Sequence, residues 1–165
     1  MEEEFEFGFS EDPKFSVERY EEMIRNQDQY FFDAQAFENI IDYYIEKNDP
    51  IKALQVVEYA LSQHPFVSVF LVKQAQLFLV TNQLNKAFAA LDKAETLEAS
   101  DPDIYTLRGT IFEGLEQHAE ALENYKKALE MSENRELKAK VVELMKLGDK
   151  VDRLKGIIIR LTELL

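Results

Sequence analysis

The chain has 165 residues, 46% of them hydrophobic and 31% charged, which is enough apolar material for one domain with a buried core. It contains no cysteine, which excludes disulfides, thiolate catalysis and cysteine-ligated metal sites. Its net charge of −13 repels phosphate backbones and anionic lipids, so it argues against nucleic acid and membranes as partners and favours basic or neutral ones. The same charge is equally expected if it only keeps a helical surface soluble.

The N-terminal stretch, residues 1–15, reads MEEEFEFGFSEDPKF and alternates acidic residues with Phe5, Phe7, Phe9 and Phe15. It is either a solubilising tail or a short segment that docks its phenylalanines in a groove of the same or another subunit. Acids follow Met1, so no secretory signal is visible, and no run approaches the roughly 20 apolar residues that span a bilayer. We therefore expect a cytoplasmic protein.

Residues 16–33 are expected to hold an N-terminal capping helix that runs from Ser16 to about Gln29. Its apolar face would be made of Val17, Tyr20, Met23 and Ile24, which recur at helical spacing. Such a helix would either cover the open side of the unit that follows or be the second helix of a degenerate unit.

The central region repeats with a period of 34 residues. Two columns hold only alanine: Ala53, Ala87 and Ala121, and Ala60, Ala94 and Ala128. Four further columns keep the same register: Phe37, Leu71 and Tyr105; Tyr44, Phe78 and Phe112; Val57, Leu91 and Tyr125; and Ile41, Ala75 and Gly109. These columns define three copies, residues 34–67, 68–101 and 102–135.

Each copy is predicted to be a helix, a short turn and a second helix. In the first copy, Phe37, Ile41 and Tyr44 fall at i, i+4 and i+7, on one helical face. Asp49 and Pro50 then provide a cap and a first-turn residue for a second helix. One hairpin cannot cover its own apolar face, but stacked hairpins can. The alanine columns would let neighbouring helices approach closely, and a larger side chain there would push the hairpins apart.

Residues 136–165 are interpreted as two helices with a turn at Gly148-Asp149, and they form either a degenerate repeat or a C-terminal cap. Leu137, Val141, Leu144 and Met145 would face one way on the first of these helices. A wide apolar stripe follows on the second one, made of Leu154, Ile157, Ile158, Leu161, Leu164 and Leu165. If the chain itself does not cover this stripe, the stripe is a candidate dimer surface.

The third copy resembles the tetratricopeptide repeat (TPR) in the columns Tyr105, Gly109, Phe112, Ala121, Tyr125 and Ala128. The segment YFFDAQAFENIIDYYIEKND is also similar to the start of long, uncharacterised bacterial TPR proteins. The resemblance implies an all-α, right-handed superhelix of about three hairpins, with an N-terminal capping helix and a C-terminal helical pair. It further implies that the first helix of each repeat lines the concave side.

No catalytic, metal or cofactor site is visible, and the chain is predicted not to be an enzyme. His64 and His118 lie at expected solvent-exposed turns without a second ligand one turn away, which indicates structural or neutral roles. The segment from Asp101 to Glu113 has Phe112 where a calcium loop needs its bidentate glutamate. Glycine-rich phosphate loops and nucleophile elbows do not occur.

The resemblance therefore implies a protein-binding scaffold, whose partner would lie against the first helices. The predicted contact residues are Glu38, Asp42, Val69, Val72, Lys73, Gln76, Leu79, Thr106, Thr110 and Glu113. Some TPR domains bind acidic C-terminal peptides through lysine, arginine and asparagine, but only Lys73 is basic here. We therefore expect a basic and apolar peptide or amphipathic helix. The alternative is a structural module that forms homodimers through the N-terminal phenylalanines or the C-terminal stripe.

Overall fold

The computed structural model describes residues 13–162, and this part of the chain is entirely helical. Asp33, Asp49 and Asp101 accept hydrogen bonds from backbone amides at the start of the helices that follow them, as N-cap residues do. The helices are α1 (Pro13–Asn26), α2 (Ala34–Glu46), α3 (Pro50–Gln63), α4 (Ser68–Val80), α5 (Leu84–Leu97), α6 (Pro102–Gly114), α7 (His118–Met131) and α8 (Arg135–Thr162).

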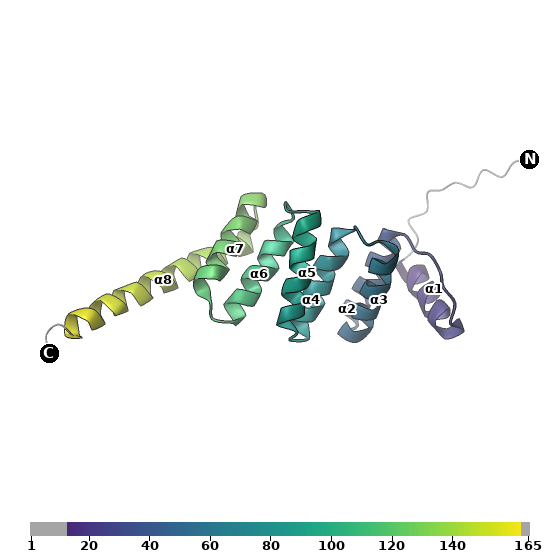
Figure 1. The fold of residues 1–165 in the computed structure, drawn as a ribbon, viewed down its shortest axis with the longest axis horizontal. Helices are drawn as coiled ribbons and strands as arrows, with labels where there is room; N and C mark the ends of the chain where they lie inside the picture. The colour runs from purple at the N-terminus through teal and green to yellow at the C-terminus, as the bar shows by residue number, and fades with distance from the viewer. Residues whose placement is uncertain (1–12, 163–165) are drawn as a thin grey trace, which may run out of the picture.

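The helices stand side by side in one row, with α1 and α8 at its opposite ends (Figure 1). Three hairpins, α2–α3, α4–α5 and α6–α7, form the body, as the 34-residue period predicts. Buried side chains form two clusters, one from α1 to α4 and the other from α4 to α8. Because α4 contributes to both clusters from different sides, the core is a layer that runs along the row rather than one closed centre.

The turn inside each hairpin also repeats every 34 residues. Asn48, Asn82 and Glu116 all have positive φ values, of 56°, 56° and 60°. In each turn the next residue donates its backbone N–H to a carbonyl in the last turn of the preceding helix, at 2.7–2.9 Å. This left-handed residue therefore ends the first helix and aims the chain into the second.

The six alanines of the repeat columns are all fully buried, with no solvent-exposed surface. They lie on α3, α5 and α7, the second helix of each hairpin. The prediction that small residues on these helices permit close packing is thus confirmed. Any larger side chain would need room that a close-packed interior lacks.

Side-chain sizes are also matched between the two helices of a hairpin. Gly109 on α6 faces the ring of Tyr125 on α7, and a Cβ at position 109 would lie 2.5 Å from the Cδ1 and Cε1 atoms of that ring. The ring is also held at its other end, because the Tyr125 hydroxyl donates to a Glu113 carboxylate oxygen at 2.7 Å. The equivalent columns hold Ala75 with Leu91 in the hairpin before. A smaller residue on the first helix thus accompanies a larger one on the second.

The capping helix is confirmed, although α1 begins and ends three residues earlier than the predicted span from Ser16 to Gln29. Val17, Tyr20 and Met23 are buried against the first hairpin, whereas Ile24 is 58% exposed and does not belong to the apolar face. Phe15 lies within α1 and is half exposed, while Phe5, Phe7 and Phe9 lie outside the described residues.

The predicted C-terminal helical pair is wrong, because α8 continues from Arg135 to Thr162 without a turn at Gly148-Asp149. A single glycine costs a helix about 1 kcal/mol relative to alanine, which does not end it when good helix formers flank it and no proline follows. Leu137, Val141 and Leu144 are buried as predicted, but Met145 is 48% exposed.

The 34-residue register is lost at α8 for a simple reason. The link before it, residues 132–134, is one residue shorter than the links 64–67 and 98–101. Leu137 and Leu144 consequently follow Ile104 and Ile111 of α6 at a spacing of 33 residues, and all four are buried. Thus α8 packs on α7 much as a first helix of another repeat would.

We predict that Gly109→Ala lowers the free energy of unfolding by about 1–2 kcal/mol. The added methyl group overpacks the contact with Tyr125 by roughly 1–3 kcal/mol, and the helical preference of alanine offsets up to about 1 kcal/mol of that. Gly114→Ala is the matched control, since a Cβ there meets nothing within 4 Å. Urea denaturation of both variants measures the difference, and an equal or greater stability of Gly109→Ala would contradict this account.

We predict that Glu116→Asn raises the free energy of unfolding by about 0.5–1 kcal/mol, because asparagine tolerates the left-handed conformation better than glutamate. The reciprocal change, Asn82→Glu, places glutamate at the equivalent turn and should destabilise by a similar amount. Thermal unfolding of the two single variants checks the pair. If both variants changed the unfolding temperature in the same direction, the left-handed turn conformation would not be the cause of the changes.

Candidate functional site

The predicted contact residues lie on α2, α4 and α6, the first helices of the three hairpins, but they are not equally accessible. Val72 is only 7% exposed and belongs to the core, so the prediction that it contacts a partner is wrong. It is buried because α4 packs against neighbours on two sides. Leu79 is half-buried against the same cluster as Val72, Val69 is half-buried against the other cluster, and Gln76 is exposed.

One ion pair joins two of the predicted residues across repeats. The ammonium group of Lys73 on α4 pairs with the carboxylate of Asp42 on α2. The Lys73 side chain is 16% exposed, whereas that of Asp42 is 52% exposed. The one basic residue among the predicted contacts is therefore already neutralised, and its acidic partner remains the more accessible of the two.

The α6 part of the predicted surface is tied into the fold by hydrogen bonds. The Thr106 and Thr110 hydroxyls donate to backbone carbonyls one turn earlier, at 2.9 and 3.0 Å. Glu113 accepts from the Tyr125 hydroxyl and lies 3.6 Å from the ammonium of Lys140 on α8. Burial, more than any other cause, raises the pKa of Tyr125. The threonine bonds lie within α6, whereas Glu113 braces α6 against α7 and α8 through Tyr125 and Lys140. Lys140 is not among the predicted residues.

The accessible part of this face is thus concentrated on α2 and on the end of α4. Glu38 is half-buried and Asp42 and Glu46 are exposed on α2, while Val80 at the end of α4 is 68% exposed. The face combines carboxylates with one strongly exposed apolar side chain and has no unpaired cation among the predicted residues. We call the outer surface that α2, α4 and α6 share the first-helix face.

His64 is not the exposed turn residue that the sequence predicts. Its Nε2 atom lies 2.7 Å from the carbonyl oxygen of Phe32, and its ring packs near those of Phe31, Phe37 and Phe70. It fastens the loop before α2 to the end of α3, which is a structural role. His118 is exposed, as predicted, and begins α7.

A second polar cluster, which the sequence did not predict, joins α5 to α6 and α7. The guanidinium of Arg108 contacts Glu95 at 2.6 Å and also pairs with Asp92. The buried Tyr105 donates its hydroxyl to Glu95 at 2.7 Å, and Lys127 lies 3.6 Å from the same carboxylate. The hydrogen bond from Tyr105, followed by the one from Arg108, lowers the pKa of Glu95.

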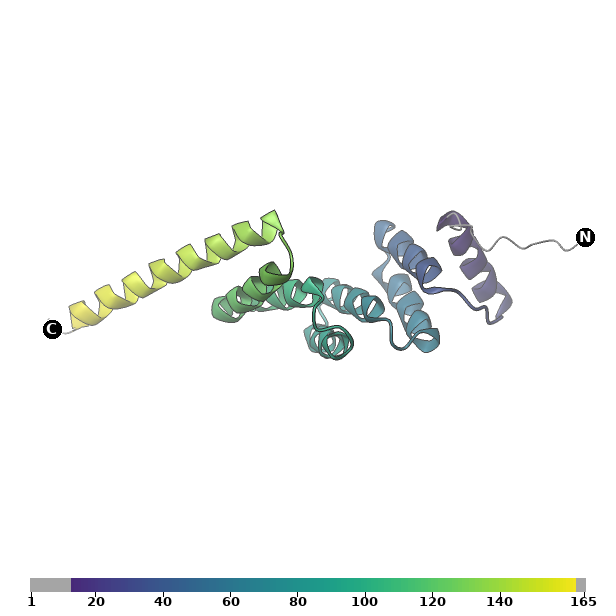
Figure 2. The same ribbon diagram turned by 90° about the horizontal axis from the view of Figure 1, so that it is seen from above.

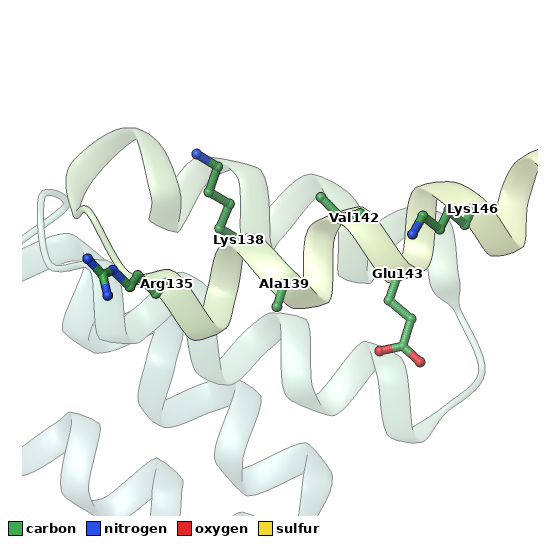
Figure 3. Close-up of a pocket in the computed structure, with 6 residues that line it drawn as sticks. All are labelled: Arg135, Lys138, Ala139, Val142, Glu143 and Lys146. Atoms are coloured by element: carbon green, nitrogen blue, oxygen red, sulfur yellow. The ribbon is translucent and has the colours of Figure 1, made fainter.

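Two surface depressions lie away from the first-helix face. One, of about 300 Å³, lies between α1, α2 and α3 and is lined partly by Tyr20, Tyr44 and Lys52. The other, of about 370 Å³, runs along α8 (Figure 3). Lys138 and Val142 in it stand 33 residues after Tyr105 and Gly109, which α7 covers in the preceding hairpin. No helix of the described chain covers them here.

Comparisons with known proteins agree with this architecture. A family model described as tetratricopeptide repeat matches residues 102–135, which are α6 and α7. No curated protein sequence matches the chain. Residues 102–135 are therefore a tetratricopeptide repeat, and the predicted resemblance is confirmed.

Solved structures match over most of the chain. The first TPR of Spaghetti (RPAP3) bound to the HSP90 peptide SRMEEVD has a TM-score of 0.64 at 18% identity, over 70% of this chain and 98% of that one. TTC0263, a thermophilic TPR protein of Thermus thermophilus, has a TM-score of 0.64 at 18% identity and 82% coverage of both chains. The second TPR domain of human RPAP3, in complex with the HSP70 peptide SGPTIEEVD, has a TM-score of 0.59 at 12% identity, over 81% and 98%. The protein has the all-α fold of TPR solenoids.

We predict that Glu95→Gln lowers the free energy of unfolding at pH 7 by about 1 kcal/mol or less, because the carboxylate is partly exposed. Its folded-state pKa lies below the ordinary 4.5, so its contribution is present above that value and is lost as the pH falls through the folded-state pKa. Denaturation from pH 7 to pH 3 should show the variant and the wild type converging at the acidic end. Glu58→Gln, at an exposed position of α3, is the control, and a gap that persists at pH 3 would contradict the ionic origin.

Proposed function

We propose that this protein is an interaction scaffold that holds a basic and apolar peptide or helix against the first-helix face. The fold supports this proposal, because helical repeats present extended surfaces rather than enclosed reactive pockets. Three carboxylates on α2, those of Glu38, Asp42 and Glu46, are accessible, and Val80 supplies apolar surface beside them. A ligand that combines cations with apolar side chains complements both features.

The charge of the first-helix face is the reason for proposing a basic ligand. RPAP3 domains with this fold were solved with the peptides SRMEEVD and SGPTIEEVD, which end in acidic residues. Here Lys73 is already paired with Asp42, and Glu38 and Glu46 lie on the same helix as Asp42. An acidic peptide on this face would meet these carboxylates, and the predicted contacts offer no free cation to bind it. We therefore propose a ligand of opposite charge to those two peptides.

Self-association is a second candidate function, and the C-terminal helix favours it. Leu147, Val151 and Leu154 on α8 are 39–51% exposed and lie on one apolar stripe. Of these residues only Leu154 belongs to the predicted C-terminal stripe, and the side chains of the rest of that stripe, Ile157, Ile158, Leu161, Leu164 and Leu165, lie outside the described part of the chain. The phenylalanines of the N-terminal tail were the other predicted route to a homodimer, and Phe5, Phe7 and Phe9 lie outside the described residues. A cytoplasmic location and a non-enzymatic role remain part of the same proposal. In the described part of the chain, no helix is both long and apolar enough to cross a bilayer.

We predict that a basic, apolar helical peptide binds the full chain and that Glu38→Lys with Glu46→Lys weakens this binding about tenfold or more. Reversing two carboxylates replaces attraction with like-charge repulsion at the contact. Fluorescence anisotropy measures the affinity with a labelled peptide that carries leucine on one face of a helix and lysine on the other. An acidic peptide of the sequence SRMEEVD serves as the comparison ligand and should bind more weakly.

The control is Glu58→Lys combined with Glu130→Lys, which makes the same change of net charge on α3 and α7. If that variant loses affinity as much as the first, only net charge is being measured and the first-helix face is not the site. Tighter binding of the acidic peptide by the wild type would also overturn the proposal.

A further inference from the structure

The second half of α8 projects beyond the body of the molecule. The helix has 28 residues, whereas each of the other described helices has 13 or 14. The buried side chains among its described residues end at Leu144, and the remaining turns extend past α7 into open space in both views (Figures 1 and 2). We call residues 146–162 the projecting half.

An apolar stripe runs along the projecting half. Leu147, Val151 and Leu154 recur at i, i+4 and i+7, so they share one helical face, and they are 39%, 39% and 51% exposed. Val151 also continues the seven-residue spacing of Leu137 and Leu144, which α7 covers. The face that α7 buries in the first half of the helix is therefore uncovered in the second. Most of the stability of a helix in a protein comes from packing of its apolar face, and the projecting half lacks this packing.

Charge separates the projecting half from the rest of the chain. It holds five basic residues and two acidic ones, a net charge of +3, so the other residues together carry −16 to give −13 for the whole chain. Lys150 and Lys155 flank the stripe in the heptad pattern, one on each side. In a symmetric pair of two such helices, these lysines would face lysines of the other copy. The sequence thus disfavours pairing of two projecting halves and favours an acidic surface as the cover.

An acidic surface of suitable size is present on the same protein. The first-helix face carries Glu38, Asp42 and Glu46 together with the exposed Val80. A helix of 17 residues is about 26 Å long, and the first-helix face extends over three helices, of which α4 contacts α6 and is joined to α2 by the Lys73–Asp42 pair. The projecting half points away from the body, so within one molecule it does not lie on this face (Figure 2).

We propose that the projecting half of α8 docks, with its apolar stripe inward, on the first-helix face of a second copy of this chain. The inference rests on the proposed function, since it names the occupant of that face. The two surfaces differ, so the contact is head-to-tail. It gives either a closed pair in which each copy donates its helix or longer chains of copies.

The test is the self-association of the full-length protein, measured by analytical ultracentrifugation over a range of concentrations. One variant, Lys150→Glu with Lys155→Glu, reverses the helix charges, and a second, Glu38→Lys with Glu46→Lys, reverses those of the face. Each alone should weaken association about tenfold or more, and an equimolar mixture of the two should restore it. Rising salt should weaken association of the wild type.

Leu154→Asp, which removes apolar contact at an exposed position, should also weaken association. Circular dichroism checks that each variant folds.

Three outcomes would overturn the inference. The wild type could stay monomeric at all concentrations, or the reversal of the face could leave association unchanged. Alternatively, an equimolar mixture of the lysine-reversed variant and the wild type could associate more strongly than the wild type alone, which indicates symmetric pairing of two α8 helices. The basic, apolar peptide that tests the proposed function distinguishes a failure of this inference from a failure of that function. If the peptide binds at the first-helix face while the copies do not associate, only the self-docking is wrong. If neither occurs, both proposals are wrong.

Discussion

Close approach of helices at small side chains is the interaction on which the rest of this structure depends. The alanines at positions 53, 87 and 121 have no exposed surface, and each lies on the second helix of its hairpin. In the third hairpin the first helix has glycine at position 109, and the residue that faces it on the second helix is the large Tyr125, whose ring fills the space. Volume is thus conserved across the contact while the individual residues change. Close packing of this kind keeps the spacing of hairpins regular, and a regular spacing produces a row rather than a closed globule.

A row of hairpins has two open ends, and the terminal helices α1 and α8 cover them differently. At the N-terminal end, α1 covers the first hairpin with Val17, Tyr20 and Met23, and its outer side carries Glu18 and Glu22. At the C-terminal end, α8 covers α7 with only its first turns and then continues outward. Terminal repeats need a polar outer face for solubility. The first end meets this requirement, whereas the second presents apolar residues flanked by lysine.

The sequence was sufficient to predict the hairpins, because their packing is periodic and local. Equal spacing of alanine and aromatic columns identified both the unit and the buried faces. It was insufficient at α8, where a link one residue shorter shifts the register and a lone glycine, which predicts a turn, lies inside a continuous helix. It was also insufficient at Val72 and His64. Exposure there depends on how tightly neighbouring hairpins and loops pack, as in the contact of His64 with Phe32, which no column of a single sequence contains.

Charge is another property that periodicity does not determine, and here it is distributed unevenly along the chain. Inside the body, cations are used between helices, as in Lys73 with Asp42, Arg108 with Glu95 and Lys140 with Glu113. Each pair joins one helix to an earlier one and leaves the accessible face acidic. The projecting half of α8 has no other described helix beside it to accept such pairs, so Lys150 and Lys155 remain on the surface. Several cations of the body are neutralised between stacked helices, whereas those of the projecting half are exposed, so the molecule carries two surfaces of opposite sign. Surfaces of opposite sign attract over about a Debye length before any apolar contact forms, so the charge pattern alone already favours association in one orientation.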